Sequence, residues 1–190
     1  MAHRWRHFSA EDEDRRKWQD PEAILADLGV KPGITFMDIG CGEGFFALPA
    51  ARAVGETGRV YALDSDPDSI SSLKTSAAKE GLTNVTAIAG RAEDLVLCQA
   101  CADIIFFGIV LHDFDDPARA LANARKMVKP GGQLVDLDWK KQRMASGPPF
   151  EKRFAEQQAG QLIEQAGFKI ETTREVGTFH YMIIARPSLA

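Results

Sequence analysis

A segment suited to close ligand binding lies in the first quarter of the chain, where DIGCGEG occupies residues 38–44. Glycine lacks a Cβ, so alternating glycines let the backbone turn tightly and let a ligand approach the main chain. The acidic residue that opens the segment adds two acceptor oxygens. The segment ends an apolar stretch, residues 34–39, and precedes a helical one, residues 45–54. In α/β folds this junction, at the carboxyl end of a strand, is where cofactors bind.

Two kinds of cofactor compete for this loop. A dinucleotide site carries G-x-G-x-x-G, and the third glycine of that pattern would fall at Phe45. The spacing found is instead acidic-x-G-x-G-x-G, at residues 38–44. A pyrophosphate binds at an exposed helix N-terminus, whereas a cofactor without phosphate does not need one. A cofactor with a zwitterionic methionine end suits a loop with Asp38 beside it, and a nicotinamide enzyme is the weaker alternative.

The elements that must hold this loop are short apolar strands that alternate with helical stretches. We expect strands at 34–39, 59–64, 85–90, 102–110, 133–139, 168–176 and 179–185. Helices are expected at 45–54 and 151–166, and after Asp20-Pro21, Asp66-Pro67 and Asp116-Pro117, where an Asp cap precedes a proline. A further helix is expected to open at Ser9, with Asp12 completing a capping box.

This order of elements predicts the fold class. Strands separated by helices form parallel βαβ units, and the two-residue turn Gly177-Thr178 makes the last pair an antiparallel hairpin. We therefore expect an α/β fold: a Rossmann-like three-layer α/β/α sandwich of about seven strands, mostly parallel, with one antiparallel strand in the C-terminal hairpin. One domain is expected over residues 1–190, with an N-terminal helical cap at 1–30 and a Rossmann-like core at 31–190.

Five motifs in this order carry a resemblance to a known family. They are DIGCGEGFF at 38–46, YALDSD at 61–66, GRAEDL at 90–95, GIVLHDFDDP at 108–117 and KPGGQL at 129–134. With them the chain resembles the class I S-adenosylmethionine-dependent methyltransferases, in the small-molecule branch similar to the ubiquinone/menaquinone methyltransferases. The resemblance implies S-adenosyl-L-methionine as cofactor, S-adenosyl-L-homocysteine as its product and methyl transfer as the reaction.

The resemblance also implies which residues bind the cofactor. They are Asp38, Gly40, Cys41, Gly42, Gly44, Asp64, Ser65, Ala92, Glu93, Gly108 and Ile109. Asp64 is expected to accept hydrogen bonds from both ribose hydroxyls, and Ala92 and Glu93 to meet the adenine edge. For Glu93, a solvated carboxylate at a helix start is the alternative. Ser65 departs from the apolar residue that many relatives place against the adenine.

The catalytic candidates are His112, Asp113 and Asp138. His112 is expected either to orient the cofactor, to act as a base, or to be structural. Asp138 shares one face of its strand with Asp136, because strand side chains alternate, and it lies at the carboxyl end. Asp113 and Asp138 lack a third ligand for Mg²⁺, so we predict no metal site. A base is optional in any case, because methyl transfer depends mostly on placing the acceptor and excluding water.

The net charge and the number of cysteines limit which partners and which cellular setting we expect. The net charge of -4 lacks the positive surplus typical of proteins that bind nucleic acid through its phosphates, so a small-molecule substrate is favoured and nucleic acid is not. No apolar run is long enough to span a membrane and no signal peptide is evident. Three cysteines are too few for a disulfide framework, which favours a cytoplasmic setting, and we interpret Cys98 and Cys101 as incidental. The oligomeric state is not predicted.

Two variable segments are expected to build the acceptor site. Residues 139–153 form a basic stretch with Gly147-Pro148-Pro149, which we interpret as a mobile flap. The N-terminal helix, with Trp5, Phe8 and Trp18, is expected to close the other side. The alternatives to a small-molecule methyltransferase are a protein or RNA methyltransferase and a non-enzymatic S-adenosylmethionine-binding protein.

Overall fold

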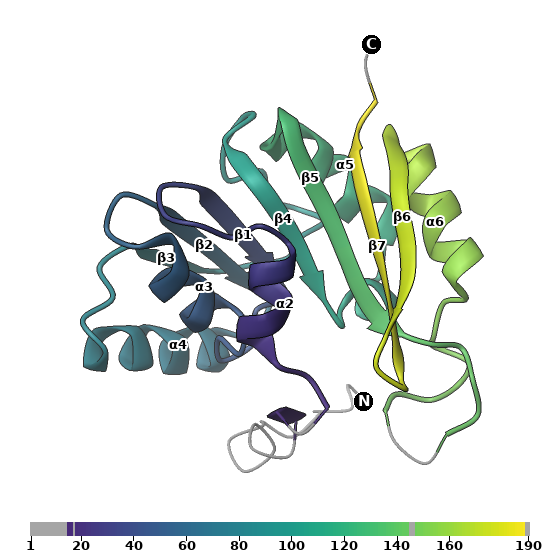
Figure 1. Cartoon of the computed structure of the whole chain (residues 1–190), viewed down its shortest axis with the longest axis horizontal. Coiled ribbons are helices and arrows are strands. Elements are labelled where there is room, and N and C mark those ends of the chain that lie inside the picture. The colour runs from purple at the N-terminus through teal and green to yellow at the C-terminus, as the bar shows by residue number, and fades with distance from the viewer. Residues whose placement is uncertain (1–14, 17, 145–146, 189–190) are drawn as a thin grey trace.

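A seven-stranded sheet forms the centre of the molecule, in the order β3-β2-β1-β4-β5-β7-β6 (Figure 1). The computed structural model describes residues 15, 16, 18–144 and 147–188. The strands are β1 (Thr35–Ile39), β2 (Arg59–Asp64), β3 (Val85–Ala89), β4 (Ala102–Gly108), β5 (Val128–Trp139), β6 (Phe168–Val176) and β7 (His180–Pro187). All neighbouring pairs among β1 to β5 are parallel, whereas β7 runs antiparallel to both β5 and β6. This is the predicted arrangement, including the single antiparallel strand.

Helices cover both faces of the sheet, which gives the predicted three layers. They are α2 (Pro21–Asp27), α3 (Ala47–Val54), α4 (Pro67–Lys79), the short 3₁₀ helix η1 (Leu111–Asp113), α5 (Pro117–Met127) and α6 (Glu156–Gln165). The caps form as predicted, because the carboxylates of Asp20, Asp66 and Asp116 each accept a backbone N–H from the first turn of their helix. Among the described residues, no helix is long and apolar enough to cross a membrane.

Each face of the sheet has its own hydrophobic core. One core packs α2, α3 and α4 against the sheet, and the other packs α5 and α6 (Figure 1). Strand β4 supplies both, because Phe106 points into the first core and Phe107 into the second, and both are fully buried. Such a strand, apolar on both faces, is what a central parallel strand requires.

The topology brings the functional loops to one edge of the sheet. The chain leaves β1 toward β2 and β3, and then returns to β4 on the other side of β1. In such folds ligands bind beyond the carboxyl ends of the two adjacent strands whose connections leave in opposite directions, and here these strands are β1 and β4. The glycine loop follows β1, and η1 follows β4.

Several predicted boundaries are wrong. Strand β5 begins at Val128 instead of Gln133, because Val128 pairs with Ala102 before the register shifts. Helix α6 begins at Glu156 instead of residue 151, because the Arg153 side chain bonds to loop carbonyls and holds the preceding residues as a loop. The predicted helix start at Ser9 and Asp12, and the aromatic residues Trp5 and Phe8, lie outside the described residues.

Candidate functional site

The glycine loop turns sharply where β1 ends. Gly40 and Gly42 have φ values of +75° and +52°, a region that side chains with a Cβ rarely adopt. A Cβ on Gly40 would lie 2.3 Å from Cγ2 of Val110, so the loop packs directly against the segment that follows β4. At Gly42 no other atom lies within 4 Å of the position a Cβ would take. The loop therefore presents an open, side-chain-free backbone on one side.

Asp64 lies beside this loop at the end of β2. Its Oδ2 accepts the backbone N–H of Gly42 at 2.8 Å, and its Oδ1 accepts that of Asp66 at 2.9 Å. Each carboxylate oxygen has a second lone pair, so the group retains acceptor capacity for a ligand. The neighbouring Ser65 is exposed. The structure thus brings together the loop and the acidic residue that the sequence predicts as a ribose ligand.

Asp38 is the buried acid of the loop, with 1% of its surface exposed. Among the described residues, its Oδ2 has no hydrogen-bond partner. Burial raises the pKa of Asp38 to about 7, against the lowering effect of Arg15 and with a further increase from Asp64. A buried carboxylate oxygen without a partner is uncommon in proteins and marks a place where a cationic group would be stabilised.

Ala92 and Glu93 lie in the turn that follows β3. The Glu93 carboxylate accepts the backbone N–H of Asp115 at 3.1 Å and a guanidinium N–H of Arg91 at 3.2 Å. The backbone carbonyls of Ala92 and Glu93 accept from the side-chain amide of Asn123. Glu93 is buried, so the alternative of a solvated carboxylate is wrong. The Glu93 carboxylate instead connects the turn after β3 to Asp115, in the loop that precedes α5.

His112, Asp113 and Asp138 come together in space. Nδ1 of His112 lies 2.7 Å and 2.9 Å from the two carboxylate oxygens of Asp138, and Nε2 lies 3.4 Å from Oδ2 of Asp113. Burial alone would lower the pKa of His112, but the hydrogen bonds and charges of Asp113 and Asp138 outweigh it and raise the pKa to about 9. Asp138 therefore fixes the orientation of the imidazole.

Asp136 and Tyr181 are two further buried polar residues close to Asp138. Burial, and then the negative charge of Asp138, raise the pKa of Asp136 well above its usual value. Burial, followed by the charges of Asp136 and Asp138, raises the pKa of the Tyr181 phenol. Tyr181 pairs directly with Asp138 across β5 and β7, so all three side chains share one face of the sheet. Sequence reasoning missed Tyr181, because only the hairpin register places it beside the two acids.

Comparisons with known proteins identify the family. The family described as "Methyltransferase domain" matches residues 30–176. The chain belongs to this methyltransferase family. It is 33% identical to a demethylmenaquinone methyltransferase of Bacillus licheniformis over 125 residues, which are 65% of this chain and 51% of that protein. A Staphylococcus aureus protein of the same name is 27% identical over 143 residues, 75% of this chain and 56% of that protein.

Among solved structures, a SAM-dependent methyltransferase from Aquifex aeolicus superposes with a TM-score of 0.87 and 31% identity. That match covers 93% of this chain and 94% of the other. The chain spans only about half the length of the two demethylmenaquinone methyltransferases. The comparisons confirm two predictions, the Rossmann-like fold and the methyltransferase family.

Aromatic side chains line the edge of the site beside β5 and β7. Trp18 stacks on His180 with ring centroids 5.1 Å apart and also lies 5.5 Å from Trp139. Burial, and then the positive charges of Arg15, Lys140 and Arg153, lower the pKa of His180 to about 3. The His180 imidazole is therefore neutral at physiological pH. Trp18 therefore packs on the end of β5 and the start of β7, and closure of the acceptor site by the N-terminal segment stays a prediction.

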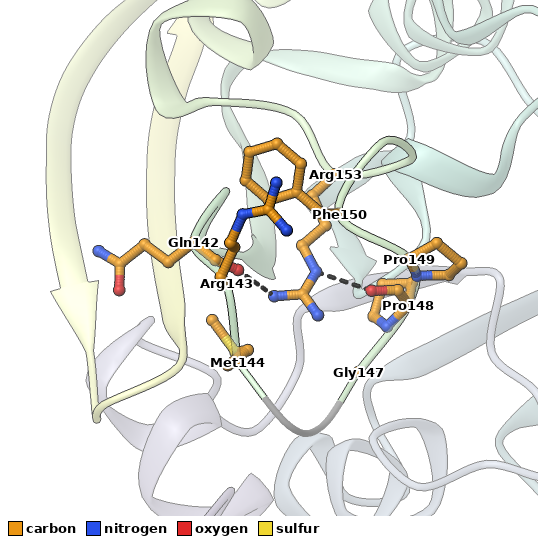
Figure 2. Close-up of a pocket in the computed structure, with 8 residues that line it drawn as sticks. All are labelled: Gln142, Arg143, Met144, Gly147, Pro148, Pro149, Phe150 and Arg153. Carbon is orange, nitrogen blue, oxygen red and sulfur yellow. Dashed lines mark hydrogen bonds between the residues drawn. The ribbon is translucent and has the colours of Figure 1, made fainter.

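The described residues of the basic segment after β5, 140–144 and 147–153, line an open pocket (Figure 2). The pocket has a volume of about 360 Å³ and is lined by Gln142, Arg143, Met144, Gly147, Pro148, Pro149, Phe150 and Arg153. Arg153 points into this loop, and its guanidinium donates to the carbonyls of Pro148 and Gln142 at 2.9 Å each. Lys152 forms an ion pair with Asp113 at 3.1 Å, which connects the loop to the His112 group.

One pairing of cysteines was not predicted. Cys98 and Cys101 form a disulfide in the loop before β4. Ala100 between them has a φ of +45°, which is rare for a residue with a Cβ. Cys41 is a buried free thiol, and burial, followed by the charges of Asp38 and Asp64, raises its pKa. Cys41 therefore stays protonated and is not a nucleophile.

Proposed function

We propose that this methyltransferase transfers the methyl group of S-adenosylmethionine to a small-molecule acceptor, beside His112. The observation that carries the proposal is the contact between two parts of the site. The cofactor loop packs at Gly40 against Val110, and Val110 lies two residues before His112. A ligand along the loop and an acceptor at the imidazole would therefore be neighbours, as methyl transfer requires.

The residues present fit the cofactor. The unpartnered Oδ2 of Asp38 suits its ammonium group, and the spare lone pairs of Asp64 suit the ribose hydroxyls. The open backbone at Gly42, where no atom lies within 4 Å of a Cβ position, leaves room for the ligand, and we assign Gly40, Cys41 and Gly44 to the same binding loop. We assign the adenine to Ser65, after β2, and to Ala92 and Glu93, after β3. We assign the methionine part to the backbone of Gly108 and Ile109, at the end of β4. When bound, the cofactor supplies a methyl group already activated by its positive sulfur.

His112 acts in this scheme as the acceptor of a substrate proton. With Nδ1–H held by Asp138, the lone pair of a neutral imidazole lies on Nε2, on the side of the exposed Asp113. The pKa of about 9 keeps most His112 side chains protonated at neutral pH, so the basic form grows as the pH rises toward 9. Asp138 serves as a positioning residue, and Asp113 shares Nε2 until a substrate replaces it.

The acceptor is proposed to bind in the pocket lined by residues 142–144 and 147–153. A cavity of about 360 Å³ lies within the range of small-molecule sites. Phe150 offers a flat apolar surface, with the Arg143 guanidinium 5.5 Å from its ring centroid. The relatives named for demethylmenaquinone support an acceptor that is a cyclic organic molecule. The net charge of -4 argues against RNA as the acceptor.

The test is an acceptor screen with release of S-adenosylhomocysteine as the signal. The panel contains hydroxylated aromatic compounds, small amines and thiols, together with transfer RNA and a protein mixture. We expect turnover with a small hydroxylated aromatic compound and a rate that rises with pH up to about 9. His112→Gln should lose that pH dependence and at least about 100-fold in kcat, in the range of general-base effects. Turnover confined to RNA or protein would contradict the proposal.

A further inference from the structure

The stretch of chain that lines the pocket after β5 is strongly basic. Residues 139–153 contain a single acid, Glu151. The same residues contain five cations: Lys140, Lys141, Arg143, Lys152 and Arg153. The chain as a whole has a net charge of -4, so this positive charge is a local feature. A hollow surface lined by one sign of charge attracts ligands of the opposite sign.

Three of the five cations have partners within the protein. Lys140 forms an ion pair with Glu175 of β6 at 2.9 Å. Lys152 forms its ion pair with Asp113 of η1 at 3.1 Å. Arg153 donates to backbone carbonyls of the same stretch. These three side chains therefore serve to hold the basic stretch in place.

Lys141 and Arg143 are the two cations that remain. Among the described residues, neither side chain forms an ion pair or a hydrogen bond, and Glu151 neutralises neither of them. Both lie beside one aromatic ring instead, because the Lys141 ammonium is 5.7 Å and the Arg143 guanidinium carbon 5.5 Å from the ring centroid of Phe150. Figure 2 shows the Arg143 guanidinium next to this ring. Two cations at one ring repel each other, and an anion beside both would relieve that repulsion.

Apolar side chains form much of the remaining lining of the pocket. They are Met144, Pro148, Pro149 and Phe150. None of the described lining residues is an acid, so nothing in this lining repels an anion. An apolar surface with an aromatic ring suits the flat face of a cyclic ligand. The lining therefore matches a ligand that combines an apolar ring with an anionic group.

We infer that the methyl acceptor is an aromatic carboxylate, whose ring packs on Phe150 and whose carboxylate binds Arg143, with Lys141 adding a second positive charge. A guanidinium can donate two parallel hydrogen bonds to one carboxylate, and this favours the carboxylate over a neutral amide of the same shape. The inference rests on the proposed function, because it names the class of acceptor for that reaction.

The experiment compares two probes that differ in one charge, para-hydroxyphenylacetate and para-hydroxyphenylacetamide. Ligand-observed NMR titration measures the binding of each to the full chain, with and without S-adenosylhomocysteine, and requires no turnover. The variants Arg143→Gln and Lys141→Gln each remove one charge and keep a polar side chain. The matched control is Lys74→Gln, in the exposed part of α4. Circular dichroism establishes that each variant is folded.

We expect the wild-type protein to bind the carboxylate at least about 10-fold more tightly than the amide, the preference typical of a hydrogen bond to a charged group. Arg143→Gln should remove most of this preference and change amide binding by less than about threefold. Lys141→Gln should weaken carboxylate binding by about threefold, as for a partly exposed ion pair, and Lys74→Gln should change neither probe. The preference should also shrink as salt is added, because salt screens exposed charges.

Equal binding of the two probes by the wild-type protein would overturn the inference, and so would the binding of neither probe. A preference that survives in the double variant Arg143→Gln with Lys141→Gln would overturn it as well. Methyl transfer to a neutral small molecule in the same protein would then leave the proposed function standing. Carboxylate binding that depends on Arg143, in a protein that methylates only RNA or protein, would overturn the proposed function and with it the identity of the acceptor.

Discussion

Asp38→Asn should make the cofactor-free protein more stable and make it bind its cofactor less well. The pKa of Asp38 is about 7 in the folded protein and 3.8 in the unfolded chain, a difference of about three units. At 1.36 kcal/mol per unit, the ionised carboxylate destabilises the folded state by about 4 kcal/mol at high pH. Asparagine keeps an oxygen for the backbone N–H of Ala47 and removes the charge.

The sign of the pH dependence follows from proton binding. Between pH 4 and 7 the folded state holds the Asp38 proton and the unfolded state has lost it, so stability falls as the pH rises. The advantage of Asp38→Asn should be about 4 kcal/mol at pH 8 and about 1.7 kcal/mol at pH 5, and it should approach zero below pH 3. For a chain of this size, the advantage at pH 8 corresponds to roughly 10 °C in Tm.

Urea unfolding of both proteins at pH 5 and pH 8, without cofactor, measures this difference. Equal m values would show that the variant exposes the same surface on unfolding. Calorimetry on the same samples should show weaker binding of S-adenosylhomocysteine by Asp38→Asn, because the ammonium group loses its counter-charge. An advantage that does not depend on pH, or a variant less stable than wild type at pH 8, would refute the reasoning.

Three further predictions concern the glycine loop, the His112–Asp138 pair and the cysteines. Gly40→Ala should lower the free energy of unfolding by several kcal/mol, as measured in urea, and abolish cofactor binding. The control Gly29→Ala has a similar φ but no atom within 4 Å of its Cβ position, so it should cost only about 1 kcal/mol. Equal costs for the two variants would contradict the clash with Val110. Asp138→Asn should lower the pKa of His112 from about 9, as followed by NMR of its imidazole; an unchanged value would exclude the ion pair. Denatured, unreduced protein should titrate one thiol and reduced protein three; three before reduction would rule out the Cys98–Cys101 disulfide.

The sheet order and the helix caps could be predicted because local signals dominate there. The Asp-Pro pairs at residues 20, 66 and 116 each begin a helix, and the apolar run that contains β4 lies at the centre of the sheet. The boundaries of α6 and β5 could not, because both depend on distant contacts. Arg153 bonds to the backbone carbonyls of Gln142 and Pro148, and Val128 pairs with a strand more than 20 residues earlier.

The same holds for the candidate site. The motifs and the resemblance they carry placed Asp38, Gly40 and Asp64 in one loop region, and the structure brings them together at the ends of β1 and β2. Tyr181 could not be predicted, because no local pattern says which buried carboxylate it meets; its position depends on the register of the β5–β7 pair.

The central claim is that this chain binds S-adenosylmethionine through the glycine loop and Asp64. Calorimetric titration of the wild-type protein with S-adenosylhomocysteine tests it most directly, with Asp64→Ala alongside and the exposed Asp68→Ala as control. We predict micromolar binding by the wild type and the control, and a loss of at least about 100-fold in Asp64→Ala, because two charge-assisted hydrogen bonds to the ribose disappear. Well-folded wild-type protein that does not bind S-adenosylhomocysteine would contradict the account.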